Sequence, residues 1–110
     1  MARVLVIISS QSVEKALTGL MWATNAFKNR WVEDVEVIFF GPVERLIAEG
    51  NERLMHAIIE YSGIKGRPLA CRRIAEKEGY EDKLEGKVNL VYVGSLIGNY
   101  LEKNYVPMVF

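Results

Sequence analysis

The stretch VLVIISSQS, residues 4–12, decides the fold class. Residues 4–8 form an unbroken run of apolar, mostly β-branched side chains, and residues 9–12 end it with polar ones. A strand with one solvated face alternates apolar and polar residues, whereas a strand covered on both faces is apolar throughout. The run therefore predicts a strand of a parallel sheet that carries helices on both faces.

The rest of the chain repeats this strand–helix order. Four such units and a final strand predict one domain over residues 1–110, an α/β three-layer sandwich with a mainly parallel five-stranded sheet and flavodoxin-like architecture. The final strand contains Pro107, which suits a position where one ladder bond is not needed. The expected strands are 4–8, 35–41, a short one within 63–70, 88–94 and 105–110. The expected helices are 13–31, 43–62 (broken at Gly50-Asn51, with Asn51 as a cap), 72–78 and 95–104.

The composition excludes several classes of protein. Lys plus Arg and Asp plus Glu number 14 each, so the net charge is zero and no nucleic-acid partner is expected. A single cysteine excludes a disulfide framework and favours a reducing, cytoplasmic location. The apolar run near the N-terminus is too short for a signal-peptide core or a membrane span. One cysteine and one histidine cannot build a structural zinc site, and the nucleotide-binding glycine motifs are absent, so no metal or cofactor is expected.

Four loops are expected to meet at one edge of the sheet, at 9–12, 41–43, 70–72 and 94–96. Ligands of parallel α/β sheets bind outside the carboxyl ends of the strands. Serine hydroxyls and helix N–H groups in these loops can hold a small anion, and the alternative is that the serines only cap and turn. The candidates for anion binding or thiolate support outside the third loop are Ser9, Ser10, Gly41, Gly94 and Ser95.

Cys71 stands in the third loop, where a strand is expected to give way to helix 72–78. A helix N-terminus and neighbouring cations favour the thiolate, which is the nucleophilic form of cysteine, and Arg72 and Arg73 follow directly. Two interpretations stay open, a reactive thiol and an inert buried residue, because free cysteines are often buried. The two arginines are likewise either supports for an anion or solvated surface charges.

Three other side chains bear on the site or on assembly. His56 falls in the middle of a helix away from its apolar face, which predicts a surface or interface position and no catalytic pair with Cys71. Glu44 comes just after Gly41-Pro42, where it can serve as a polar group at the same edge of the sheet, although an acidic residue at a helix start is the favoured role. Trp22 is expected about 180° from the core face of helix 13–31, on the same outward side as Ala26. We predict that Trp22 contacts another subunit, the alternative being chance exposure.

The chain resembles the DsrE/DsrF-like family over nearly its whole length. The resemblance lies in four stretches in the same order: VLVIISS with EKALTGLMWATNAF, then VEVIFFGPVERLI, then PLACRRIAEKEG, then VNLVYVGSLIGNYLEKNY. Its most specific part is a cysteine directly after the third strand with a short helix behind it. The charged helix RRIAEKE and the polar loop YEDKLEGK depart from the family pattern.

The resemblance implies a small cytoplasmic protein of sulfur relay or intracellular sulfur oxidation. Family members that keep the cysteine accept sulfur as a persulfide from a donor protein and pass it to an acceptor, and Cys71 stands at that position. Members commonly assemble as trimers or hexamers, so a homo-oligomer is expected. The main alternative is a non-catalytic oligomeric module that binds a small anion or nucleotide, with Cys71 only in the pocket wall. A redox-sensing thiol ranks last, because the chain has no resolving cysteine.

Overall fold

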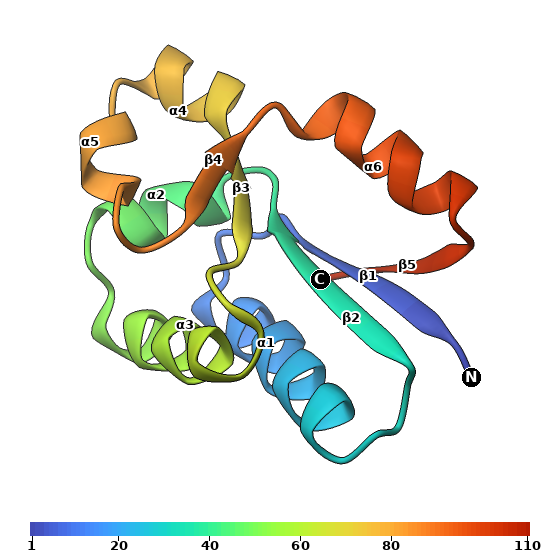
Figure 1. Ribbon diagram of the computed structural model, residues 1–110. Helices are drawn as coiled ribbons and strands as arrows, with labels where there is room; N and C mark the ends of the chain where they lie inside the picture. The colour runs from blue at the N-terminus through green and yellow to red at the C-terminus, as the bar shows by residue number, and fades with distance from the viewer.

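The computed structural model describes residues 1–110 and has the predicted α/β fold (Figure 1). All five strands are parallel, and their order across the sheet is β4-β3-β2-β1-β5. The strands are β1 (Arg3–Ile8), β2 (Asp34–Phe39), β3 (Leu69–Cys71), β4 (Asn89–Val91) and β5 (Tyr105–Val109). The helices are α1 (Val13–Lys28), α2 (Val43–Ala48), α3 (Glu52–Lys65), α4 (Arg72–Glu78), α5 (Glu81–Leu84) and α6 (Val93–Glu102).

The connections place the helices on two faces of the sheet. Strands β1 to β4 are neighbours in chain order, and the helices that join them pack on one face. Helix α6 then carries the chain back across the other face, from the β4 edge to β5 beside β1 (Figure 1). The layers are those of flavodoxin, whereas the strand order differs from the 2-1-3-4-5 order of flavodoxin.

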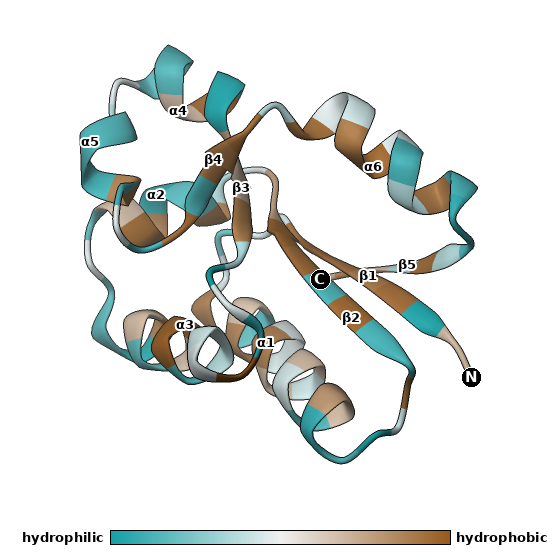
Figure 2. Cartoon of the chain, in the orientation of Figure 1, coloured by the Kyte–Doolittle hydropathy of each residue, from teal (hydrophilic) through white to brown (hydrophobic).

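Two hydrophobic clusters, one on each face of the sheet, explain why residues 4–8 of β1 are apolar throughout. The large core, under α1 to α5, contains Val4, Val6 and Ile8 of β1 and the alternate residues of β2. The small core, under α6, consists of Leu5, Ile38, Cys71 and Val93. Figure 2 shows apolar residues along much of β1 and β3 and hydrophilic ones over most of α4 and α5.

Helix α1 approaches the sheet through small residues. Its buried positions are Ala16, Gly19, Leu20, Ala23, Thr24 and Ala26. A side chain at Gly19 would begin 3.0 Å from Cδ1 of Ile8 and from the ring of Phe110. Small residues thus make up most of the core face of α1.

This rotation overturns the predicted outward face of α1. Ala26 is fully buried, and Trp22 is half-buried against the large core. The exposed apolar residue of the helix is Met21. Helix α1 also ends at Lys28 rather than at residue 31, and Trp31 is 57% exposed. The subunit contact of Trp22 stays a prediction, but the outward position from which it was inferred is not what the structure shows.

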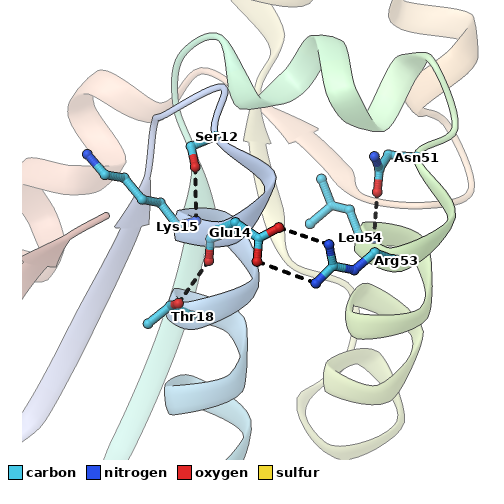
Figure 3. A network of polar contacts seen from close by, with 7 residues as sticks. All are labelled: Ser12, Glu14, Lys15, Thr18, Asn51, Arg53 and Leu54. Carbon is cyan, nitrogen blue, oxygen red and sulfur yellow. Dashed lines mark hydrogen bonds and ion pairs between the residues drawn. The ribbon is translucent and has the colours of Figure 1, made fainter.

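Local capping fixes where α1 and α3 begin (Figure 3). The Ser12 hydroxyl accepts from the N–H of Lys15 at 3.3 Å, and the Asn51 side chain accepts from the N–H of Leu54 at 3.0 Å. The Arg53 guanidinium donates to the Glu14 carboxylate at 2.8 and 3.4 Å and joins the first turns of the two helices. The break predicted at Gly50-Asn51 is therefore confirmed.

The third and fourth strands differ from their predicted extents. Residues 63–65 belong to the end of α3, so that Lys65 reaches Asp34 at 2.7 Å and Glu36 at 3.1 Å. Strand β3 covers only Leu69–Cys71 and β4 only Asn89–Val91. Helix α5 was not expected, because its four residues are too few to show a period. No helix in the structure is long and apolar enough to cross a membrane.

Candidate functional site

The parallel sheet brings the four predicted loops to one edge, where they form two adjoining groups. Ser9 and Gly41 adjoin, since the Val43 N–H donates to the Ser9 carbonyl at 3.0 Å. A Cβ at Gly41 would overlap the Ser9 hydroxyl and lie 2.9 Å from the Ser9 carbonyl oxygen, and the φ of Gly41 is +143°. Only glycine suits this close approach.

The serines of the first loop are used within the fold. The Ser10 hydroxyl accepts from the N–H of Ser12 at 3.0 Å. The N–H groups of Ser9 and Ser10 donate to the carbonyl of Phe110 at 2.9 and 3.3 Å. These contacts cap and turn the chain, which favours the structural alternative weighed for Ser9 and Ser10.

The second group surrounds Cys71, which is the last residue of β3 and the N-cap residue of α4. The side chain of Ala70 enters the large core, so the next side chain, Cys71, points to the opposite face and enters the small core. There it packs with Leu5, Ile38 and Val93 and is 4% exposed. The predicted strand–helix junction is confirmed, and the thiol at that junction is buried.

A topological switch point lies beside Cys71. The chain leaves β3 into α4 on the large-core side, and it leaves β4 into α6 on the small-core side. Figure 1 shows α4 and α6 diverging from the ends of these two neighbouring strands. In open parallel sheets such a divergence opens a crevice that binds ligands.

A hollow of about 390 Å³ lies at this point. Cys71 contributes to its wall, together with two apolar residues at the ends of β2 and β4 and the exposed first turn of α6. The lining residues are Phe40, Cys71, Arg73, Ile74, Tyr92, Val93, Gly94 and Ser95. The structure thus groups Cys71 with Arg73, Gly94 and Ser95 in the wall of the hollow, which Ser9, Ser10 and Gly41 do not line.

The two arginines after Cys71 have different surroundings. The Arg72 guanidinium donates to the carbonyl of Leu90 at 3.3 Å and lies 3.6 Å from the Glu81 carboxylate, so it braces β4 and α5. Arg73 is exposed, lines the hollow and makes no ion pair. Arg73 is therefore the cation available to an anion in the hollow.

The first turn of α6 forms the opposite wall of the hollow. Tyr92 occupies the N-cap position without a side-chain capping bond, and the first turn has no acidic residue. The hydroxyl of Tyr92 donates instead to the Glu76 carboxylate at 3.0 Å. The positive end of the α6 dipole is thus left without a neutralising side chain next to Gly94 and Ser95.

Glu44 is the residue of this edge whose role the sequence misjudged. It is fully buried, and neither carboxyl oxygen has a hydrogen-bond partner. Burial raises the pKa of Glu44 to about 8, and the N–H groups of Cys71 and Gly41 that face the carboxyl offset this only in part. The sequence signal for this burial is helical spacing. Ile47 and Ala48 follow Glu44 by three and four residues, so all three lie on one side of the helix.

His56 is exposed in the middle of α3, as predicted, and lies away from this edge. No three His, Cys, Asp or Glu side chains of the chain are grouped so as to hold a metal ion. The site therefore consists of one thiol, one free arginine, an uncapped helix start and a buried carboxyl.

Solved structures share the fold of this chain, although neither a protein-family model nor a curated protein matches its sequence. The conserved protein of unknown function BT1422 from Bacteroides thetaiotaomicron is 18% identical, with a TM-score of 0.81 over 96% of this chain and 93% of that one. The protein of unknown function MTH1491 from Methanobacterium thermoautotrophicum is 19% identical, with a TM-score of 0.75 over 100% of both chains. At such identities the likeness shows the α/β fold alone.

Proposed function

We propose that this chain is a sulfur carrier of the DsrE/DsrF-like kind, in which Cys71 accepts sulfur as a persulfide and passes it to a partner thiol. The observation that carries the proposal is the position of Cys71 in the wall of the hollow between β3 and β4. Ligand sites of parallel sheets occupy this place, and the chemistry needs no second cysteine.

The transfer conserves sulfur, charge and oxidation state. The Cys71 thiolate attacks the outer sulfur of a donor R–S–SH, a new S–S bond forms at Cys71, and the donor S–S bond breaks to release R–S⁻. The proton lost by the Cys71 thiol balances the one that R–S⁻ gains from solvent. Attack by an acceptor thiolate on the outer sulfur of Cys71–S–SH then reverses these steps and regenerates the Cys71 thiolate.

The surroundings of Cys71 supply the anion support that this chemistry needs. Arg73 is free of ion pairs and can face the anionic persulfide across the hollow. The uncapped start of α6 adds the amides of Gly94 and Ser95 on the opposite wall. Arg72 takes no part in this, because its guanidinium is held by Leu90 and Glu81.

The partners in this proposal are a donor protein with a persulfide and an acceptor protein with a thiol. A single free cysteine suits the reducing cytoplasm, where we place the reaction. The family resemblance adds assembly as a homo-oligomeric trimer or hexamer, which would bring several copies of Cys71 into one particle.

Mass spectrometry after incubation with glutathione persulfide tests the proposal. We expect the native chain to gain the mass of one sulfur atom, reversibly with dithiothreitol, and Cys71→Ser to gain none. Arg73→Gln, which removes the free cation, should slow the gain several-fold, whereas Lys77→Gln on the exposed side of α4 should not. A gain that survives Cys71→Ser, or its absence in the native chain, overturns the assignment.

The burial of Cys71 favours a second candidate, a non-catalytic module that binds a small anion or nucleotide in the same hollow. At 4% exposure the thiol can serve as a wall, with Arg73 and the first turn of α6 binding the ligand. Alkylation by iodoacetamide separates the candidates. A carrier reacts in the native state, whereas a wall residue reacts only after unfolding.

A further inference from the structure

The carboxyl of Glu44 is a buried polar group beside Cys71 that the proposed chemistry leaves unexplained. An acidic residue in the first turn of a helix ordinarily points to water, where it faces the positive end of the helix dipole. Glu44 points inward, is fully buried and leaves both oxygens without a partner. Buried polar atoms are nearly always hydrogen-bonded, so an exception beside a candidate site calls for an explanation.

Glu44 lies where the ends of two strands meet. From the β2–α2 loop the N–H of Gly41 faces its carboxyl, and from the β3–α4 junction the N–H of Cys71 does so, neither in full hydrogen-bond geometry. Tyr80, which is also buried, faces it from the connection between α4 and α5. The carboxyl is thus placed against the backbone of the residue that carries the thiol.

No cation neutralises Glu44. The nearby charges on α2 and α4, Arg45 and Glu78, pair with each other at the surface at 3.2 Å. A carboxylate without a cation in a buried site is costly, and this cost is what raises the pKa of Glu44 to about 8. At neutral pH the group is therefore mostly the uncharged acid.

We propose that Glu44 is a positioning residue for Cys71 that, as a neutral carboxyl, keeps the β3–α4 junction free of negative charge so that residue 71 can hold an anionic sulfur. The inference rests on the proposed sulfur chemistry. A carboxylate at Glu44 and an anionic sulfur at Cys71 are like charges in a poorly solvated region, so each disfavours the other. The site accommodates one negative charge. Because Glu44 is protonated, that charge can lie on the sulfur.

The test is the pH dependence of Cys71 reactivity in the native chain and in Glu44→Gln, which is neutral at every pH. Two reactions are followed from pH 6 to pH 9.5, alkylation by iodoacetamide and loading by glutathione persulfide. We expect the native rates to rise less steeply with pH above about pH 8 than the rates of Glu44→Gln. The ratio of the rate at pH 9.5 to that at pH 7 should be smaller in the native chain than in Glu44→Gln, by at most about tenfold, which is the limit for two sites coupled by one pK unit.

Glu78→Gln is the matched control, since it removes one acidic charge at the surface of the same region and should leave the native profile unchanged. Equal pH profiles for the native chain and Glu44→Gln overturn the inference. The alkylation profile can change as expected while no persulfide forms. That outcome supports the role of Glu44 toward the thiol and refutes the sulfur carrier instead.

A second measurement decides the matter if Glu44→Gln does not fold. Infrared difference spectra of the native chain follow the carbonyl stretch of a protonated carboxyl as the pH rises. We expect such a band to persist at pH 7 and to disappear around pH 8. Loss of every protonated-carboxyl band below pH 6 overturns the inference.

Discussion

At the scale of single residues, the carboxyl edge of the sheet depends on two positions that tolerate little change. Gly41 lets the chain turn against Ser9, and Glu44, three residues later, enters the interior beside Cys71. Both residues belong to the sharp turn after β2 and the first turn of α2, and this turn directs the Glu44 side chain inward. A change at either residue is expected to act on stability first and on the thiol second.

Gly41→Ala should lower the free energy of unfolding by about 2 kcal/mol or more, because a Cβ there meets the Ser9 hydroxyl in an unfavourable backbone conformation. Urea denaturation measures the loss. Gly50→Ala is the matched control: its φ is +74°, yet nothing lies within 4 Å of the added atom. Its cost should be only about 1 kcal/mol, and equal losses for the two variants contradict the predicted clash.

Glu44 should make the protein less stable as the pH rises. Its pKa is raised from 4.5 to about 8 in the folded state, so the folded chain binds this proton more tightly than the unfolded chain. The contribution is full below pH 4.5 and is lost progressively up to about pH 8. Each pH unit in this window costs about 1.4 kcal/mol at most.

Urea denaturation at pH 5, 6.5 and 8 checks this trend. Glu44→Gln lacks the titrating group and should lose markedly less stability than the native chain over the same range. Glu78→Gln should follow the native chain. Parallel curves for the native chain and Glu44→Gln mean that Glu44 is not protonated in the fold.

At the scale of elements, the short strand β3 leaves the first part of β2 unpaired on that side, and the end of α3 covers it. Strand β3 pairs with only Ile38 and Phe39 of β2. The Lys65 ammonium pairs with the carboxylates of Asp34 and Glu36, and the Tyr105 hydroxyl donates a hydrogen bond to Asp34. Residues 63–65, which the sequence places in the third-strand region, thus form the end of a helix that contacts β2 through Lys65.

Lys65→Met should lower the free energy of unfolding at pH 7 by about 1–3 kcal/mol, because it leaves two half-buried carboxylates without their cation. Burial alone would raise the pKa of Asp34, but the hydrogen bonds from Lys65 and Tyr105 hold it below the usual 3.8. A lowered folded-state pKa adds stability above pH 3.8 that is lost as the pH falls further.

The difference between native chain and Lys65→Met should therefore shrink in urea titrations at pH 3. Lys77→Met on the exposed side of α4 should change the unfolding free energy by less than about 0.5 kcal/mol. A Lys65→Met effect as small as that of Lys77→Met contradicts the bridging role.

At the scale of the whole molecule, the order β4-β3-β2-β1-β5 sends α6 alone over one face of the sheet. Because one helix covers this face, the core under α6 has only four buried residues, and Cys71 is one of them. The large core holds the other helices and most of the buried residues. Because α6 begins at the switch point, the same helix both covers the thiol and borders its access route.

We predict that the chain assembles in solution as a trimer or hexamer. Sedimentation velocity should give a particle of three or six chain masses. Trp22 is half-buried against the large core, so Trp22→Ala should lower the stability of the subunit by less than the about 3–5 kcal/mol that a fully buried tryptophan contributes. Met21→Ser, at the exposed neighbouring position, should leave the subunit stable and serves as the control. A monomer at all concentrations refutes the assembly.

The sequence by itself determined the fold class and where most elements lie. Unbroken apolar strands, the strand–helix order and caps such as Asn51 are local signals that tertiary packing reinforced. Strand–helix order also placed Cys71 at its junction, because parallel strands share a carboxyl edge. These features depend on interactions between residues that are close together in the sequence.

Only the tertiary structure decided which residues meet and which face solvent. It separated Arg72, held by Leu90 and Glu81, from Arg73 at the hollow, although the two are adjacent in the chain. It turned α1 so that its small residues met the sheet, and it buried Glu44 against the backbone of Cys71. These outcomes depend on strand order and on close packing between distant segments, which no local pattern encodes.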